Sequence, residues 1–314
     1  MSDVVLVTGG GGFVGTWVIR ELLARGVGAV AFDVAPNPER WRRVLGPRAE
    51  EVPFVAASLL DRDALRRACD EHRVTHFIHL AAALTPACQA DPWTGCQVNV
   101  LGGVAVFEEA RRVGARGLSH ASSLAVYGAE PDVDGPGAAG NQPPYFYGAF
   151  KKSFELIAEQ YWRHFGVASL GVRPHVVYGP ERDSGLTAGP SLAARAAVRG
   201  EPFTIGYTGS AGYDYVEDVA RAFVRGALET PPGAAVVDLP SEAACVAEFL
   251  DAIRAVVPGA ALTAEGPPIP VNLPPHPRPI TTVFPDWRGT PLAEGVRRTV
   301  AFYQPASRAP SGAG

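Results

Sequence analysis

Short apolar segments alternate with amphipathic segments along the first half of the chain. Runs of aliphatic and β-branched side chains predict buried strands at residues 4–7, 29–32, 52–56, 75–79, 117–121 and 168–172. Apolar positions at helical spacing predict helices at residues 13–25, 61–71, 99–112 and 147–164. Strands that are apolar throughout and separated by helices are typical of a parallel sheet covered on both faces. We therefore expect an α/β fold built on a doubly wound parallel sheet.

The pattern changes after Arg173, where proline and glycine become frequent and the predicted elements become short and irregular. We expect residues 1–173 to form the first domain, with residues 219–240 returning to it. Residues 174–305 are expected to form mainly a smaller substrate-binding domain. Residues 266–279 are too rich in proline for a central strand or helix. The tail, residues 306–314, is expected to be disordered.

Composition narrows the choice of partners. The chain has 314 residues, a net charge of −4 and 4 scattered cysteines, so it shows no basic excess and no disulfide or zinc pattern. No apolar run is long enough to span a bilayer, and the N-terminus has no cationic leader. We expect a cytoplasmic protein that binds a small molecule and neither nucleic acid nor membrane. His72, His76 and His79 are interpreted as packed or capping residues, so no metal is expected.

A glycine-rich segment, residues 8–15, lies between the first predicted strand and the first predicted helix. Gly9 allows a tight turn, Gly12 lets the backbone approach a pyrophosphate, and Gly15 lets the helix pack closely on the strand. The N–H groups at the helix N-terminus would then face the phosphates. This context predicts a dinucleotide site in a Rossmann domain.

Asp33 ends the second predicted strand, where an acidic side chain accepts hydrogen bonds from the adenosine ribose. A carboxylate at this place repels the 2′-phosphate of NADP. Arg40, Arg42 and Arg43 follow and could bind such a phosphate, but we interpret them as a solvated helical face. The sequence therefore favours NAD as the cofactor.

Tyr147 and Lys151 are four residues apart on a predicted helix, so the phenol and the ammonium share one face. A nearby cation lowers the pKa of a tyrosine toward working pH, as a base for a hydroxyl proton requires. Lysine occurs in this chain only at positions 151 and 152, which makes its presence here informative. Ser123 follows a strand end, where its hydroxyl could bond the reacting oxygen.

Six motifs occur along the chain in the order Thr8-Gly9-x-x-Gly12-x-x-Gly15, His79-Leu80-Ala81-Ala82, Asn99-Val100-x-Gly102, Ser122-Ser123-x-x-Val126-Tyr127-Gly128, Tyr147-Gly148-Ala149-x-Lys151 and Arg173-Pro174-x-x-Val177-Tyr178-Gly179-Pro180. Together they resemble the extended short-chain dehydrogenase/reductase superfamily, the group of NAD-dependent sugar epimerases and dehydratases, over residues 1–302. The resemblance implies that Ser123, Tyr147 and Lys151 are catalytic, with Tyr147 as acid/base. It also implies a homodimer formed through the helices at residues 99–112 and 147–164.

The same resemblance implies the residues that line the two binding sites. Those against NAD would be Gly9, Gly12, Phe13, Val14, Asp33, Ser58, Leu59, Leu80, Ala81, Ala82, Tyr147, Lys151 and Pro174. Those against a sugar-like substrate would be Thr85, Ser123, His175 and Arg182. Arg182 is a candidate for an anionic or polyhydroxyl group.

Three departures from the family pattern narrow the chemistry. Leu124 and Ala125 stand where the dehydrating members have an Asp-Glu pair, so elimination of water is not expected. Val176 replaces a usual Asn, and Ala211-Gly212 replaces a usual Arg-Asp that binds a diphosphate. We therefore favour an NAD-dependent oxidoreductase that interconverts a secondary alcohol and a ketone on a sugar-like or polyhydroxy substrate.

Two alternatives remain open. One is a sugar or nucleotide-sugar epimerase, similar to UDP-glucose 4-epimerase, with tightly bound NAD and a transient keto intermediate. The other is a non-catalytic NAD-binding regulator on the same fold.

Overall fold

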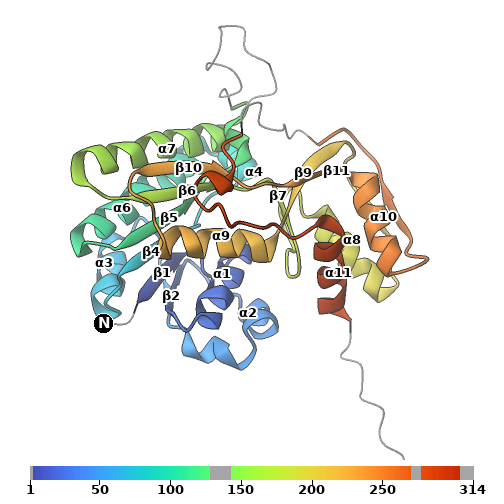
Figure 1. Ribbon diagram of the computed structural model, residues 1–314, viewed down its shortest axis with the longest axis horizontal. Helices are drawn as coiled ribbons and strands as arrows, with labels where there is room; N and C mark the ends of the chain where they lie inside the picture. The colour runs from blue at the N-terminus through green and yellow to red at the C-terminus, as the bar shows by residue number, and fades with distance from the viewer. Residues whose placement is uncertain (1–2, 128–142, 270–276, 305–314) are drawn as a thin grey trace, which may run out of the picture.

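The computed structural model describes residues 3–127, 143–269 and 277–304. Its main element is a seven-stranded sheet in the order β10-β6-β5-β4-β1-β2-β3, in which every pair of neighbours is parallel (Figure 1). The strands are β1 (Val4–Thr8), β2 (Gly28–Asp33), β3 (Phe54–Ala56), β4 (His76–His79), β5 (Gly117–Ala121), β6 (Ser169–Arg173) and β10 (Ala234–Asp238). The predicted doubly wound Rossmann sheet is thereby confirmed.

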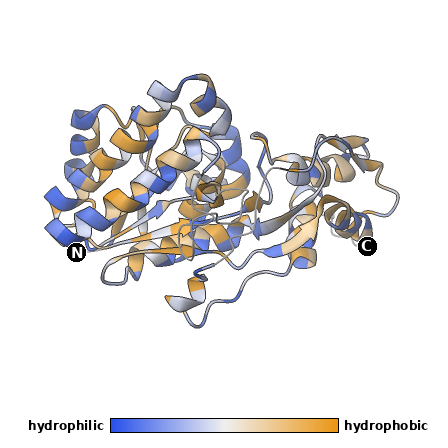
Figure 2. Cartoon of the chain, turned by 90° about the horizontal axis from the view of Figure 1, so that it is seen from above, coloured by the Kyte–Doolittle hydropathy of each residue, from blue (hydrophilic) through white to orange (hydrophobic). Residues whose placement is uncertain are grey.

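Helices cover both faces of this sheet. One face carries α1 (Phe13–Ala24), α2 (Pro38–Leu45) and α9 (Val216–Leu228), and the other carries α3 (Arg62–Glu71), α6 (Gly102–Val113) and α7 (Phe146–Phe165). Each face has its own apolar core, with Trp17 and Phe223 in the first and Phe107 and Phe154 in the second. The helices show both orange and blue turns in Figure 2, as amphipathic helices do.

A smaller part of the molecule lies beyond the end of the sheet (Figure 1). It contains a sheet of β7 (Val176–Tyr178), β9 (Ser210–Tyr215) and β11 (Glu242–Cys245), and a pair formed by β8 (Phe203–Ile205) and β12 (Leu262–Ala264). Its helices are α8 (Gly189–Arg199), α10 (Val246–Val256) and α11 (Leu292–Tyr303). The rings of Tyr178, Tyr213 and Phe249 pack together in its core.

The expectation of short, irregular elements after residue 173 is wrong for these helices. Proline and glycine there mark helix ends: α8 has Pro190 in its first turn and ends at Gly200, which has φ +70°. Proline fits the first turn because its missing N–H would have no partner there, and glycine adopts the left-handed cap at little cost.

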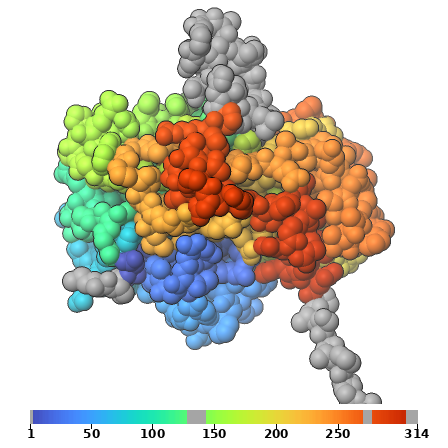
Figure 3. Space-filling model, viewed as in Figure 1, coloured from blue at the N-terminus to red at the C-terminus, as the bar shows by residue number. Residues whose placement is uncertain are grey.

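Later residues return to the main sheet. Strand β10 pairs with β6 as an edge strand, and α9 packs against α1 and β5. Residues 277–291 then cross from β10 to α11 over the face that Figure 3 shows. The domain boundary at residue 173 stays a prediction, and the predicted disordered tail lies outside the described residues. No helix of the described part is long and apolar enough to cross a bilayer.

Candidate active site

The glycine-rich turn lies where the order of strands reverses, because the chain passes from β1 to β2 on one side and later to β4 on the other. Ligands bind parallel α/β sheets at this place, beyond the carboxyl ends of the strands. Gly9 has φ +75°, and a Cβ there would lie 2.8 Å from the backbone N of Ala81. A Cβ at Gly15 would collide with the carbonyl of Gly9. Both positions therefore require glycine.

The start of α1 can bind an anion. Gly12 is its N-cap and has no side chain to occupy the first N–H groups of the helix, which start at Phe13 and Val14. These groups line a cavity at the turn. The close turn, the open helix N-terminus and the acidic residue described next fit the pyrophosphate and ribose of a dinucleotide.

Asp33 lies at the end of β2, on the wall of the same cavity. Its two carboxylate oxygens accept hydrogen bonds from the backbone N–H groups of Gly11, at 3.0 Å, and Val34, at 2.7 Å. Burial raises the pKa of Asp33, and these two bonds oppose the shift. The carboxylate is thereby fixed in orientation and keeps further lone pairs for a ligand.

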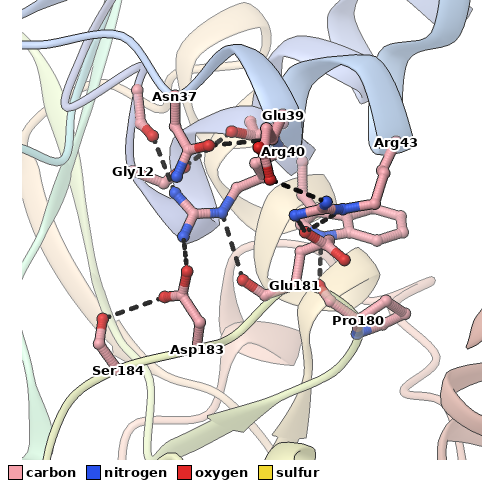
Figure 4. A network of polar contacts seen from close by, with 12 residues as sticks. Gly12, Asn37, Glu39, Arg40, Arg43, Pro180, Glu181, Asp183 and Ser184 are labelled. Atoms are coloured by element: carbon pink, nitrogen blue, oxygen red, sulfur yellow. Dashed lines mark hydrogen bonds and ion pairs between the residues drawn. The ribbon is translucent and has the colours of Figure 1, made fainter. Parts of the chain in front are cut away.

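The interpretation of Arg40 as part of a solvated helical face is wrong, because its side chain is buried among protein groups (Figure 4). Its guanidinium donates to the carbonyls of Gly11 and Glu181, and lies 2.8 Å from Asp183. Arg43 is exposed, as expected, and its guanidinium donates to the Glu181 carboxylate at 2.8 Å. Both guanidinium groups are therefore engaged with protein atoms, which leaves them poorly placed to hold a 2′-phosphate.

A second turn, after β4, faces the glycine-rich turn. Leu80, Ala81 and Ala82 line the cavity there, and the side chain of Asn99 holds the following residue, Ala83, through two hydrogen bonds of 3.0 and 3.1 Å. Asn99 lies in a π-helical turn, Gln97–Leu101, that precedes α6. The helix predicted around residues 99–112 corresponds to this π-helical turn and α6, which follow one another without a break.

Ser123, Tyr147 and Lys151 come together on the cavity wall. Ser123 follows β5 and begins the short turn Leu124–Val126, while Tyr147 lies in the first turn of α7. A Cβ on Gly148 would collide with the carbonyl of Ala125, so this glycine lets α7 approach the serine turn.

Burial governs the protonation of this group. It raises the pKa of Tyr147 to about 12, and a hydrogen bond from Ser123 acts in the opposite direction. It also lowers the pKa of Lys151 to about 8. The Lys151 Nζ donates to the carbonyl of Ala121 at 2.8 Å and lies 5.7 Å from the centre of the Tyr147 ring. A cation is thereby held beside the phenol in a poorly solvated place.

A buried polar network that sequence reasoning missed supports these residues. Glu155, one helical turn after Lys151, accepts from Arg173 at 2.6 and 2.7 Å and from Ser122 at 2.6 Å. Arg173 also donates to Tyr127, which donates to Asp238 at 3.2 Å. The spacing of Lys151 and Glu155 on one helix face was the available signal, but the partners come from distant strands.

The candidate substrate residues line the cavity as well. The His175 Nδ1 is buried next to Gly212 and has no hydrogen-bond partner among the described residues, and burial lowers the pKa of this histidine to about 4. Arg182 donates to the carbonyl of Val177 and, at 2.5 Å, to the hydroxyl of Thr187. Thr85 begins α4 (Thr85–Ala90).

Of the histidines considered earlier, His72 caps the end of α3, whereas His76 and His79 lie in β4. His79 lies 2.7 Å from the hydroxyl of Thr8 through its Nδ1, and His76 lies 2.9 Å from Thr75. His120 packs edge-on against Phe107 and Phe154. The described residues contain no group of three or more side chains that could hold a metal ion.

The cavity itself has a volume of about 790 Å³, within the usual range for ligand sites. All of the residues that the sequence suggested for NAD and substrate lie on its wall. Its wall also contains residues that the sequence did not suggest, among them Arg40, Leu84, Pro86, Val98, Tyr145, Ser184, Leu186, Thr187, Val219 and Phe223.

Comparisons with known proteins agree with this geometry. The family model described as "NAD dependent epimerase/dehydratase family" matches residues 5–237. A UDP-glucose 4-epimerase of Mycolicibacterium smegmatis is 32% identical over 225 residues, which are 70% of this chain and 72% of the relative. A probable UDP-glucuronate 4-epimerase of Rhizobium meliloti is 30% identical over 233 residues, 70% of this chain and 67% of the relative.

Among solved structures, the UDP-glucose 4-epimerase of Thermus thermophilus, in complex with NAD, is similar with a TM-score of 0.79 and 30% identity. The match covers 96% of this chain and 98% of the other. The family model covers most of the chain, and the resemblance of the motifs is confirmed. The chain belongs to the NAD dependent epimerase/dehydratase family and is an NAD-dependent enzyme with the extended short-chain dehydrogenase/reductase fold.

Proposed function

We propose that this protein is an NAD-dependent epimerase that inverts a secondary alcohol on a sugar carried by a nucleoside diphosphate. The observation that carries the proposal is the gathering of Ser123, Tyr147 and Lys151 on the wall that also contains the glycine-rich turn. The relatives favour epimerisation over the net oxidation that the sequence placed first, since those at 30–32% identity are 4-epimerases.

The chain offers a complete set of contacts for the cofactor. Phe13 and Val14 at the start of α1 would hold the pyrophosphate, and Asp33 would hold the adenosine ribose. Ser58 and Leu59 would line the adenine end. The remaining contacts, toward the nicotinamide end, would come from Gly9, Gly12, Leu80, Ala81, Ala82, Tyr147, Lys151 and Pro174. Bound NAD supplies a reversible hydride acceptor for the carbinol carbon.

Tyr147 moves the proton. Its phenolate accepts the hydroxyl proton as the alcohol is oxidised, and the phenol returns it when the ketone is reduced on the opposite face. Ser123 donates a hydrogen bond toward the reacting oxygen, and Lys151 stabilises the phenolate by its charge. Because burial keeps the pKa of Tyr147 at about 12 even with the opposing hydrogen bond from Ser123, the phenolate also needs the charge of Lys151.

The proposal is tested on the purified protein. Mass spectrometry of the supernatant after denaturation should find NAD retained from purification, and NMR should show interconversion of UDP-glucose and UDP-galactose, or of the corresponding uronates, without added NAD. Stoichiometric accumulation of NADH without an epimer would instead identify a net dehydrogenase. Absence of both signals would refute catalysis on these sugars.

NAD should bind at least about tenfold more tightly than NADP, because the Asp33 carboxylate repels a 2′-phosphate while Arg40 and Arg43 are already paired with acids. Calorimetry on protein stripped of cofactor measures both affinities. Asp33→Ala should narrow the gap, while Glu71→Ala, which removes an exposed acid at the end of α3, should leave it unchanged. Equal affinities in the wild type would contradict this prediction.

The homodimer is likewise proposed rather than observed. Of the apolar residues on α7, Phe154 and Tyr161 pack in the core and do not serve an interface, whereas Leu156 is 60% and Phe165 52% exposed. Leu101, in the turn before α6, is also exposed. Light scattering at micromolar concentration should give the mass of a dimer, and Leu156→Glu should shift it toward the monomer. A monomeric wild type would refute the assignment.

A further inference from the structure

Three cationic side chains line the cavity, and they differ in what balances their charge. Arg40 is paired with Asp183. Lys151 donates to a carbonyl beside Tyr147 and belongs to the proposed catalytic group. Arg182 has only neutral partners in the described part of the chain, the carbonyl of Val177 and the hydroxyl of Thr187.

Arg182 is unusual among the arginines of this protein. Most of the described arginines have a carboxylate within ion-pair distance, and those without one are largely solvent-exposed. Among the described arginines, only Arg182 and Arg195 lack a carboxylate within ion-pair distance and are also partly buried. Of these two, only Arg182 lines the cavity. Burial lowers the pKa of Arg182 to about 10, which is the consequence of a charge held away from water without an acidic neighbour.

A guanidinium that is held away from water without a carboxylate partner is unfavourable unless a bound anion balances its charge. We propose that Arg182, together with Thr187, binds an anionic oxygen group of the substrate, either a phosphate or a carboxylate. This inference rests on the proposed function. The Thr187 oxygen accepts from Arg182, so its own proton can be donated to the same group. Asp33, the acidic residue on the cavity wall, is already bonded by two N–H groups near the glycine-rich turn.

The loop that carries Arg182 is anchored on both sides of this residue (Figure 4). Before it, the Pro180 carbonyl accepts from the Trp17 indole at 3.0 Å, and Glu181 is buried with φ +70°. After it, Asp183 is held by Arg40. A positive φ in a residue other than glycine persists only where the surroundings enforce it, so Arg182 is presented by a preorganised segment.

Two positions at which the family pattern has polar residues for substrate binding are apolar in this chain. Val176 lies in β7 and Ala211 in β9, both 2% exposed and both apolar, so neither can bind an anion. Arg182 is therefore the cation of the described cavity wall that is available to an anionic substrate outside the catalytic group.

The test measures binding to the NAD-loaded protein by calorimetry, with UDP, UDP-glucose and UDP-glucuronate as probes. Arg182→Gln should weaken the binding of at least one probe by about tenfold to a hundredfold, the loss of one charge-assisted contact. Arg195→Gln removes an unpaired arginine that does not line the cavity and should bind all three probes as the wild type does. Arg182→Lys, which keeps the charge, should recover part of the affinity.

The three probes distinguish the two sources of the anion. An equal loss for UDP, UDP-glucose and UDP-glucuronate identifies the diphosphate, and a loss confined to UDP-glucuronate identifies the sugar carboxylate. Affinities of Arg182→Gln within twofold of wild type for all probes would overturn the proposal, and so would a wild type that binds none of them. Because binding of the probes is measured by heat and does not require epimerisation, failure of epimerisation in the wild type would refute the proposed function and leave this result standing.

Discussion

Lys151→Arg is expected to fold like the wild type and to lose turnover by about a hundredfold or more. The Lys151 side chain is 4% exposed, and its Nζ reaches the Ala121 carbonyl at 2.8 Å while lying 5.7 Å from the centre of the Tyr147 ring. An arginine fork is longer and planar, with donors in fixed directions, so it cannot place its charge at the same point. The turnover number for UDP-glucose and the thermal unfolding curve together measure this effect.

Lys152→Arg is the matched control. Lys152 lies 3.2 Å from the Glu155 carboxylate and is partly exposed, so an arginine there can keep the ion pair. Its turnover should stay within about twofold of wild type. The chain has lysine only at these two positions and uses arginine elsewhere, so full activity of Lys151→Arg would show that lysine at 151 is accidental and would refute the catalytic assignment.

Arg173→Met is expected to destabilise the protein by about 3–5 kcal/mol, because it leaves Glu155 as a buried charge without its main partner. Arg173 and Glu155 are 8% and 6% exposed, and two hydrogen bonds of 2.6 and 2.7 Å join them. Chemical denaturation measures the change in the free energy of unfolding. Turnover should fall as well, since Glu155 follows Lys151 by one turn of the same helix.

The double variant Arg173→Met, Glu155→Leu distinguishes the effect of losing the ion pair from the effect of leaving a buried carboxylate unpaired. It should be more stable than Arg173→Met alone, because the buried Glu155 carboxylate is removed together with its partner, while Asp238 keeps its hydrogen bonds from Tyr127 and from the backbone N–H of Arg278. A double variant less stable than Arg173→Met would contradict this account.

The acid dependence of Arg173→Met follows from the pKa of Glu155. Burial raises this pKa, but the hydrogen bonds and the charge of Arg173 outweigh burial, so the net pKa lies below its usual value. A carboxyl with a lowered pKa in the folded state contributes stability above its unfolded pKa and loses it as the pH falls through the folded value. Without Arg173 the carboxyl takes up its proton at higher pH, which relieves the buried charge. The stability gap to wild type should therefore narrow as the pH falls toward about 4.

The sequence predicted the parts of this protein whose signals are local. Strands buried on both faces must be apolar throughout, so their number and order along the first half were readable from the pattern alone. The glycine-rich turn requires glycine at particular places, since a Cβ at Gly9 or Gly15 would meet backbone atoms. Tyr147 and Lys151 share a helix face by spacing. These features placed the candidate NAD and catalytic residues on one edge of one sheet.

Other features depend on contacts between segments far apart in the chain. Arg40 resembles any surface arginine of an amphipathic helix, and it is buried only because Glu181 and Asp183, about 140 residues later, fold against it. Glu155 meets Arg173 because α7 packs beside the end of β6. Arg182 is distinguished by the absence of an acidic neighbour in the described structure, which no local pattern encodes. Sequence periodicity thus determined the sheet and its binding edge, because burial on a regular element repeats along the chain. The balance of charge around each buried ion was decided by the tertiary structure, because it depends on which distant side chains the packing brings within a few ångströms.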